Sequence, residues 1–248
     1  MESSLVVIPT YNESDNLAPL VSQVMDLPCF RVLVVDDNSP DGTGDLAEDL
    51  RRQYRGRVQV LHRPAKLGLG TAYVEGFRVA LQGEQSYIFQ MDADFSHDPR
   101  DLPRLLGPLH RGADLSIGSR YVAGGATRGW PLWRLVMSRL GSVYAAIILG
   151  LPIRDVTGGY RGWRRQTLEN IGLETVRSEG YAFQLEMAYR CARRNGRIAE
   201  IPILFSERRR GSSKMSTDVF MEAVTAVWRL RLEDARLPRM LRQVLVGR

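Results

Sequence analysis

Short, almost continuous runs of apolar residues alternate with helix-like segments along the first half of the chain. The apolar runs predict strands at Leu5–Ile8, Arg31–Val35, Val58–His62, Tyr87–Met91 and Leu115–Gly118. Apolar positions recur at helical spacing in Glu13–Met25, Thr43–Tyr54, Gly70–Leu81 and Asp101–His110. Asn12 is the expected N-cap of the first helix. Apolar strands separated by helices are typical of an α/β fold, with a mostly parallel sheet flanked by helices.

The pattern changes after the fifth predicted strand. Glycines at 124, 125 and 129 indicate a flexible connection, which is followed by one or two apolar helices in Trp130–Leu149. The remaining expected elements are a helix at Phe183–Arg194, a strand at Ile198–Phe205, an amphipathic helix at about 217–234 and a basic tail at 235–248. Because no linker or repeat divides the chain, we predict one domain over 1–248 with its core at about 5–215.

Composition and charge narrow the possible partners. The 248 residues are 44% hydrophobic, enough for a sizeable core, and carry a net charge of +6. This charge suits an anionic partner, such as nucleic acid, a phosphate-bearing substrate or an acidic membrane. Because no nucleic-acid-binding motif accompanies it, we expect no nucleic-acid partner. Cys29 and Cys191 have no partner motif, which indicates buried reduced thiols and a cytosolic setting.

The sequence predicts no targeting or membrane-spanning segment. Residues 1–4 lead directly into an apolar strand, without the pattern of a signal peptide, so we expect a cytoplasmic protein. A membrane-spanning helix needs about 20 apolar residues. The nearest candidate, Val143–Ile153, is shorter and contains Gly150 and Pro152. A chain of this kind can still lie on the cytoplasmic face of a membrane.

Polar residues cluster directly after four of the predicted strands. The clusters are Thr10–Glu13, Asp36–Asn38, Lys66–Gly68 and Asp92–Asp94. Turn chemistry explains any one of them. Ligands of open parallel sheets, however, bind beyond the carboxyl ends of the strands. Four clusters at successive strand ends therefore predict one shared cleft.

Asp92 and Asp94 are the candidate metal ligands. They follow a buried strand at alternate positions, so both carboxylates can reach one divalent cation. Carboxylate oxygens suit Mg²⁺ or Mn²⁺. Helix caps and surface acids share this spacing, but the position after a buried strand favours the metal. Dinucleotide and ATP sites fit poorly, because PTYNE follows the first strand and Lys66–Thr71 lacks the P-loop spacing.

Long, ordered strings resemble glycosyltransferase family two, and within it the dolichyl- or polyprenyl-phosphate mannose synthases. The strings are VVIPTYNE, VVDDNSPDGT, KLGLGTAYVEGF, MDADFSHDP, GSRY, DVTGGYRGW, GYAFQLEM and FSERRRGSSK, and they span about residues 5–232. The resemblance implies a Rossmann-like GT-A fold with interfacial helices and a C-terminal helix. It implies transfer of mannose from GDP-mannose to a dolichyl or polyprenyl monophosphate at a membrane surface, with Mg²⁺ or Mn²⁺ as cofactor. A membrane-anchored protein partner stays open.

The resemblance also implies roles on the donor side. Pro9, Tyr11 and Glu13 would hold the guanine nucleotide, with Val35 and Asp37 closing around its base and ribose. The motif Asp92, Ala93 and Asp94 would hold the metal that bridges the diphosphate. Where bacterial and archaeal members carry a glutamine two residues after the motif, this chain has Ser96, so a ligand role for Ser96 stays open.

Basic residues would serve the phosphates. The resemblance implies that Arg120, Arg208 and Lys214 contact the donor phosphates and the transferred group. It implies that Arg120, Arg134 and Ser138 meet the lipid phosphate. Arg120 could instead pair with a nearby carboxylate, and the run around Arg208 could be a solvated face. The spacing RRRGSSK favours a glycine-hinged loop that closes over anions.

Charge considerations predict a simple mechanism. An acceptor phosphate is already anionic and needs no strong general base, whereas the leaving diphosphate needs its charge neutralised by a metal and basic residues. A single in-line displacement would invert the anomeric carbon. One competing interpretation is hexosyl transfer from a UDP-sugar to the same lipid. Another, from a different class, is a non-catalytic nucleotide-sugar-binding protein.

Overall fold

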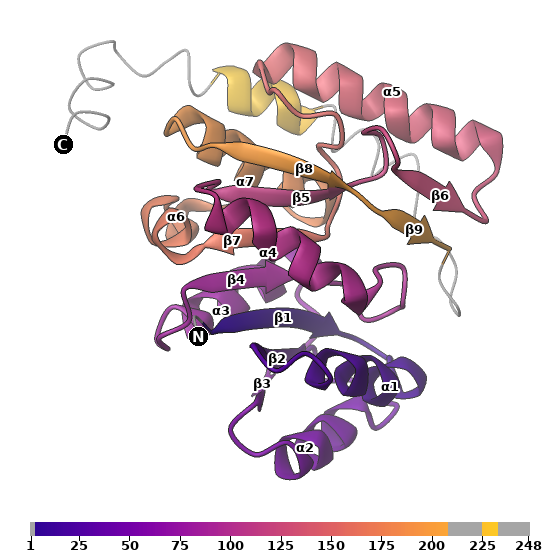
Figure 1. The fold of residues 1–248 in the computed structure, drawn as a ribbon, viewed down its shortest axis with the longest axis vertical. Helices are drawn as coiled ribbons and strands as arrows, with labels where there is room; N and C mark the ends of the chain where they lie inside the picture. Colours follow the sequence, from indigo (N-terminus) through magenta and orange to yellow (C-terminus); the bar gives the residue numbers. More distant parts are fainter. Residues whose placement is uncertain (1–2, 208–224, 233–248) are drawn as a thin grey trace.

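The computed structural model describes residues 3–207 and 225–232, and it contains two sheets (Figure 1). The strands of the larger sheet are β1 (Ser4–Thr10), β2 (Phe30–Asp36), β3 (Val58–His62), β4 (Tyr87–Gln90), β5 (Leu115–Ser119), β7 (Arg161–Arg164) and β8 (Ile198–Pro202). They lie in the order β3-β2-β1-β4-β7-β5-β8. The smaller sheet pairs β6 (Ala126–Arg128) with β9 (Leu204–Ser206) in parallel.

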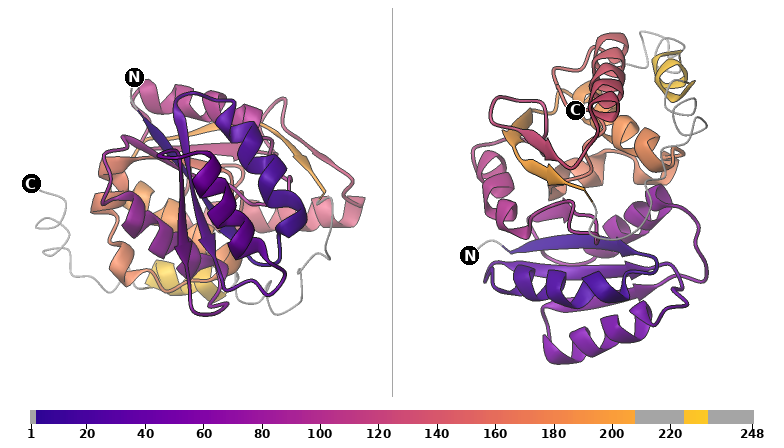
Figure 2. Two further views of the ribbon diagram at one scale, coloured as in Figure 1. Left: turned by 90° about the horizontal axis from the view of Figure 1, so that it is seen from below. Right: turned by 90° about the vertical axis from the view of Figure 1, so that its right-hand side faces the viewer.

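Helices cover both faces of the larger sheet (Figure 2). They are α1 (Ser14–Met25), α2 (Thr43–Gln53), α3 (Leu69–Ala80), α4 (Leu102–His110), α5 (Leu132–Leu149), α6 (Arg165–Asn170) and α7 (Gly180–Arg193), with short 3₁₀ turns at Pro99–Asp101 and Leu173–Thr175. Residues 225–232 are also helical. All five of the helices predicted outside the Trp130 and C-terminal segments form close to their expected positions.

The core explains why the strands contain so few polar residues. In β1, Val6 and Ile8 point into a core shared with α1, α2 and α4. Leu5 and Val7 alternate with them and point into a second core, shared with α3, α5, α7 and the 225–232 helix. Because successive side chains of a strand face opposite sides, a strand covered on both sides must be apolar at every position. The predicted, mostly parallel sheet flanked by helices is confirmed.

One strand of the larger sheet runs against the others. β7 is antiparallel to both of its neighbours, β4 and β5. The sequence did not predict β7, because its four residues, RGWR, show neither an apolar run nor clear alternation. Arg161 and Trp163 are nevertheless fully buried. The Trp163 indole N–H donates to Gln90 Oε1 at 2.7 Å, and the Arg161 guanidinium donates to three backbone carbonyl groups.

Two local expectations were wrong. Asn12 is not the N-cap of α1, because its φ of 61° turns the chain before the helix, and Glu13 occupies the cap position without a side-chain capping bond. The predicted single strand Ile198–Phe205 is two strands, β8 and β9, in different sheets. Ile203 lies between the two strands and is buried, so the apolar run in the sequence is not interrupted there. The chain nevertheless changes its pairing at this residue, from β5 to β6.

Helix α5 is long and largely uncovered. The sequence predicted one or two helices here, and the structure has one continuous helix. This helix ends at Gly150, whose backbone adopts the left-handed conformation. By length and composition it could cross a membrane, and 22% of it is buried. This finding corrects the expectation that no segment is long and apolar enough. The predicted C-terminal helix falls partly outside the described residues, of which only 225–232 belong to it.

Candidate active site

Hydrogen bonds between polar residues connect the carboxyl ends of β1 and β2. Thr10 lies beside Asp36 in the strand register, and its hydroxyl donates to Asp36 Oδ1 at 2.9 Å. The Asp37 backbone N–H donates to the Thr10 carbonyl oxygen at 3.0 Å. The backbone N–H of Glu13 donates to the Thr43 hydroxyl at 2.9 Å. Two of the predicted clusters therefore form one hydrogen-bonded rim, with side chains that were expected to hold the nucleotide.

A buried arginine that the sequence did not single out anchors this rim. The side chain of Arg63, just after β3, is fully buried and donates to Asp37 Oδ1 at 2.5 Å and to the Thr71 hydroxyl at 2.6 Å. Burial raises the pKa of the Asp37 carboxyl, and Arg63 acts in the opposite direction. Arg63 thus provides the Asp37 carboxyl group with a charged hydrogen-bond donor at the strand end. Its only sequence signal was a charge immediately after an apolar strand.

The other predicted nucleotide residues differ in their exposure. Pro9, Tyr11 and Glu13 are partly exposed at the end of β1. The Lys66 ammonium lies 4.0 Å from the centroid of the Tyr11 ring, which brings the third polar cluster to the same edge. Val35, by contrast, is fully buried in the core between the sheet and α3. The Val35 side chain is therefore part of the core rather than of the exposed rim.

The turn after β4 carries the two candidate metal ligands. Asp92 Oδ1 accepts the hydroxyl of buried Tyr73 at 3.2 Å, and Asp94 Oδ1 accepts the Ser96 backbone N–H at 3.0 Å. Burial and the Asp92 charge raise the pKa of Tyr73 well above its ordinary value, so this phenol stays a donor. The Asp92 side chain is 30% exposed. The turn thus places two hard oxygen donors at the edge of the cleft.

His97 supports this turn from beneath. It is buried, stacks on Tyr160 at 4.7 Å and meets the edge of Phe205 at 5.4 Å between ring centroids. Burial is the main cause that lowers the pKa of His97, so the ring is neutral at pH 7. Its Nδ1 accepts the Asp92 backbone N–H at 3.2 Å. A neutral imidazole therefore fixes the backbone at the first aspartate and connects it to β9.

Arg120 is held in a buried ion pair. Its Nε and Nη2 donate to Asp155 at 2.7 and 2.6 Å, its backbone N–H donates to the same carboxylate at 2.9 Å, and Nη2 also reaches the Thr157 hydroxyl. The Asp155 side chain is fully buried and that of Arg120 is 5% exposed. The guanidinium lies within 5.4 Å of the ring centroids of Tyr121, Trp130 and Phe205. Arg120 is thus largely engaged inside the protein.

Arg134 and Ser138 lie on the inner face of α5. The Ser138 hydroxyl accepts the Tyr121 O–H at 2.7 Å. Arg134 is buried, packs 4.2 Å from the Trp130 ring centroid and lies 3.5 Å from Glu207 Oε1. Arg134 Nε and Trp130 Nε1 are both buried N–H donors, and neither has a hydrogen-bond partner among residues 3–207 and 225–232. Buried orphan donors are costly, so this pair marks a place suited to an anion. The predicted residues Arg208 and Lys214 lie outside the described residues.

The chemistry of the acidic turn fits Mg²⁺ or Mn²⁺. Within residues 3–207 and 225–232, no group of three or more His, Cys, Asp or Glu side chains is arranged to hold a metal ion. Asp92 and Asp94 would therefore need ligands from the substrate, as Mg²⁺ sites with one or two carboxylates do. The Ser96 hydroxyl, a further hard oxygen, is buried and has no hydrogen-bond partner in the described part of the chain. Metal binding at this turn stays a prediction.

Comparisons with known proteins identify the fold and the family. The structure resembles glucosyl-3-phosphoglycerate synthase from Mycobacterium tuberculosis in complex with Mn²⁺, UDP and glucosyl-3-phosphoglycerate (TM-score 0.66, 20% identity, covering 96% of this chain and 81% of that one). It also resembles residues 1–349 of S. aureus TarS in complex with UDP-GlcNAc (TM-score 0.63, 18% identity, covering 99% and 70%). These likenesses establish a GT-A-like fold.

Two relatives in sequence cover nearly the whole chain. Polyprenol monophosphomannose synthase of Mycolicibacterium smegmatis is 48% identical over 240 residues, which are 95% of this chain and 91% of that protein. Undecaprenyl-phosphate mannosyltransferase of Micrococcus luteus is 50% identical over 226 residues, 91% and 92% of the two chains. Residues 5–172 match the family Glycosyl transferase family 2. The chain therefore belongs to glycosyl transferase family 2 and is a glycosyltransferase.

Proposed function

We propose that this enzyme transfers mannose from GDP-mannose to a dolichyl or polyprenyl monophosphate at a membrane surface. One observation carries the proposal: the chain is 48% identical, over 95% of its length, to a protein named polyprenol monophosphomannose synthase. Nearly full coverage includes the strand ends, the acidic turn and α5 alike. GDP-mannose as donor, the need for Mg²⁺ or Mn²⁺ and inversion at the anomeric carbon are parts of this proposal.

On the donor side, the protein's own residues position the nucleotide diphosphate. The rim formed by Pro9, Tyr11, Glu13 and Asp37 would bind the nucleoside, with Arg63 holding the Asp37 side chain in place. Asp92 and Asp94 would hold a divalent cation, which when bound would neutralise charge on the leaving diphosphate. Tyr73 and His97 orient the Asp92 side chain and backbone through the hydrogen bonds described above.

On the acceptor side, the mechanism needs an anion-binding group and no strong base. The acceptor phosphate carries its own negative charge, so proton removal is unnecessary before it attacks the anomeric carbon. Arg134 and Trp130 offer buried N–H donors beside the cleft. The Arg120 guanidinium, held in place by Asp155, lies 5.3 Å from the centroid of the Trp130 ring. A single displacement between donor and acceptor would invert the anomeric configuration.

Supplying alternative donors tests the proposal directly. We expect the enzyme to form mannosyl polyprenyl phosphate from GDP-mannose with Mn²⁺ or Mg²⁺, in an amount at least about 100-fold greater than the product from UDP-glucose. Chelation of the metal should leave little product, because the leaving diphosphate then lacks its counter-charge. Incorporation of radiolabelled sugar into the lipid phase measures the transfer. Product from UDP-glucose alone would show that the donor is UDP-glucose and not GDP-mannose. Undiminished transfer in the presence of chelator would show that the reaction needs no metal ion.

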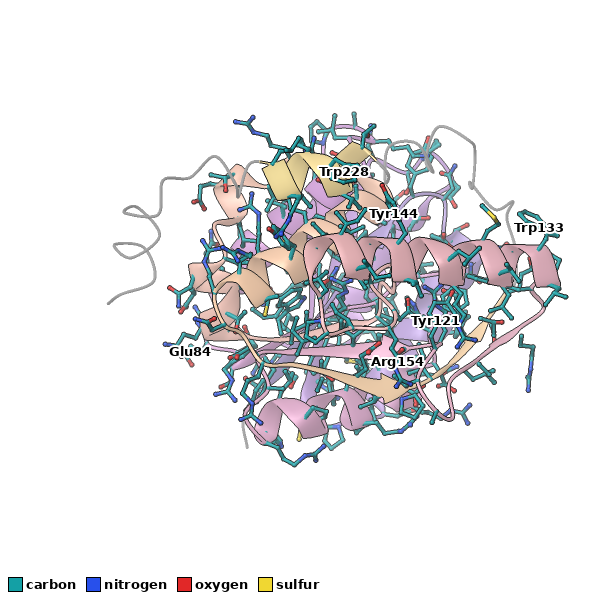
Figure 3. All side chains as sticks on the ribbon, turned by 90° about the horizontal axis from the view of Figure 1, so that it is seen from above. Glu84, Tyr121, Trp133, Tyr144, Arg154 and Trp228 are labelled. Atoms are coloured by element: carbon teal, nitrogen blue, oxygen red, sulfur yellow. The ribbon has the colours of Figure 1, made fainter. Side chains whose placement is uncertain are left out.

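We further propose that the outer face of α5 docks on the membrane. The buried stripe of this helix, including Ser142, Ala145 and Leu149, faces the core. The opposite face exposes large apolar side chains, namely Leu132, Trp133, Val136, Met137, Leu140, Val143 and Ile147, with 74% exposure at Leu132 and at Ile147. Figure 3 shows Trp133 near one end of α5 and Trp228 beside Tyr144. The Trp228 indole N–H donates to the Tyr144 hydroxyl at 2.9 Å, so the 225–232 helix extends this face.

Substituting this face should release the protein from membranes. We expect Leu140→Gln/Ile147→Gln to weaken binding to vesicles by on the order of tenfold or more, because each side chain loses its apolar burial in the bilayer interface. Flotation with phosphatidylcholine–phosphatidylglycerol vesicles measures the bound fraction. Leu67→Gln is the matched control, since Leu67 is 52% exposed in the loop before α3. Equal flotation of all three proteins would contradict docking through α5.

A further inference from the structure

A cavity lies along one flank of α5, apart from the turn that carries Asp92 and Asp94. It is open to solvent and has a volume of about 580 Å³. Its lining comes from the segment 120–127, from Leu135 and Arg139 of α5, and from Arg154 in the loop that follows α5. In Figure 3, Tyr121 and Arg154 lie on this flank of the helix, whereas Tyr144 and Trp228 lie on the other. The cavity therefore borders the outer apolar face of α5 on the side that the 225–232 helix leaves uncovered.

The lining of this cavity is basic without a compensating acid. It contains Arg120, Arg139 and Arg154 but no aspartate or glutamate. Arg120 is neutralised by Asp155. Arg139 and Arg154 are both exposed, and neither guanidinium forms an ion pair with any residue in the described parts of the chain. The nearest acid to the Arg154 backbone, Glu200, uses its two carboxylate oxygens on the backbone N–H groups of Arg154 and Asp155.

The rest of the lining suits a polar head group on an apolar stem. The loop at Ala123–Gly125 consists of small residues, which leave its backbone accessible from the cavity. Thr127 contributes a hydroxyl group to the lining, and Leu135 of α5 contributes an apolar side chain. Arginine guanidinium groups present planar pairs of N–H donors that match phosphate oxygens. Two such residues from different elements line one cavity beside an exposed apolar helix face, and together they provide the positive charge that a lipid phosphate requires.

We propose that this cavity binds the phosphate group of a membrane lipid through Arg139 and Arg154. The inference rests on the proposed docking of α5, which brings the cavity to the level of the lipid head groups. The phosphate belongs to an acidic phospholipid, because the reacting phosphate of the acceptor is assigned above to Arg134 and Trp130. The site is distinct from the catalytic turn and from Arg134, because those residues do not line the cavity.

Vesicle binding tests the site without any sugar donor. Each basic residue near an anionic surface contributes about fivefold to binding, so Arg139→Gln/Arg154→Gln should weaken binding to phosphatidylcholine–phosphatidylglycerol vesicles by about 30-fold. The charge-matched control is Arg31→Gln/Arg78→Gln, two exposed arginines on β2 and α3 without ion pairs in the described structure, and it should change binding less than twofold. Equal losses in the two double variants would overturn the proposal in favour of overall charge.

A conservative pair separates a phosphate site from diffuse surface charge. Arg139→Lys/Arg154→Lys keeps both charges but loses the planar donor pairs, so we expect vesicle binding to fall several-fold. Unchanged binding would overturn the site. All variants should keep the wild-type melting temperature, because neither arginine has an internal partner among the residues described.

A transfer assay in neutral detergent, without phospholipid, identifies the source of the phosphate. A higher KM for polyprenyl phosphate with little change in kcat in Arg139→Gln/Arg154→Gln would overturn the phospholipid assignment in favour of the acceptor. An unchanged KM together with weaker vesicle binding assigns an acidic phospholipid. If neither KM nor vesicle binding changes, the proposal fails. Failure of the mannose assignment would appear separately, as a wild-type enzyme that binds these vesicles and transfers another sugar.

Discussion

Replacing Asp94 with asparagine is expected to lower kcat/KM about 1000-fold or more while the protein remains folded. The carboxylate lies at the turn after β4, where its Oδ1 accepts the Ser96 N–H at 3.0 Å. Asparagine retains an oxygen that can accept this bond, so the turn should keep its shape. What is lost is the negative charge that would hold a divalent cation on the leaving diphosphate. Mannosyl transfer measured at saturating Mn²⁺, together with the melting temperature, checks both parts.

Asp98→Asn provides the matched control. Asp98 follows in the same segment and caps the Pro99–Asp101 turn through the Arg100 backbone N–H, a bond that asparagine can also accept. Its carboxylate pairs with Arg100 at 2.6 Å rather than facing the acidic turn. Activity within a few-fold of wild type is expected. Full activity of the folded Asp94→Asn variant would show that Asp94 is not needed to bind the metal. An equal loss of kcat/KM in Asp98→Asn would indicate general disruption of the segment.

Asp155→Asn is expected to destabilise the fold by about 3–5 kcal/mol. The substitution leaves the buried Arg120 guanidinium without its counter-charge and weakens three hydrogen bonds of 2.6–2.9 Å. Removing one partner of a buried pair is costly because the remaining charge has neither water nor a partner. The free energy of unfolding from urea denaturation measures the loss. An unfolding free energy equal to that of wild type would show that the pair is solvated in solution.

Two further variants separate charge burial from the effect of substitution itself. Glu169→Gln removes an exposed ion pair with Arg165 and should change stability by less than about 1 kcal/mol. Arg120→Met/Asp155→Leu replaces both charges with apolar groups and should recover much of the stability lost in Asp155→Asn. If the double variant is stable but transfers no sugar, Arg120 is required for activity. If it is both stable and active, the pair serves the fold alone.

Local sequence features predicted the central sheet well. The strands β1 and β2 are apolar at nearly every position, a pattern that only burial on both faces explains. β7 was missed because its burial depends on partners distant in the chain: Trp163 donates to Gln90, 73 residues away. The break at Ile203 was missed for a similar reason, since hydropathy reports that a residue is buried but not which sheet it joins.

In the candidate site, too, some features could be predicted from the sequence and others depended on tertiary contacts. The acidic turn and the rim at the strand ends could be predicted because parallel strands bring their carboxyl ends to one edge. The pairings Arg63 with Asp37 and Arg120 with Asp155 could not, because their partners are 26 and 35 residues apart and the sequence does not reveal their burial. Val35 is an example of a residue next to a site motif whose side chain lies in the core.

For α5, the sequence established an apolar helix with basic residues, but not which of its faces would be covered. Hydrophobic spacing serves equally for packing on a core and for lying on a membrane. The tertiary structure decided which face is covered, because one stripe of α5 packs inward while Leu132, Trp133 and Ile147 stay exposed. The sequence by itself determined the family, the sheet and the acidic turn, since these follow from local order. Only tertiary contacts decided which charges are buried in pairs and which stay exposed, because those properties arise when distant segments exclude water together.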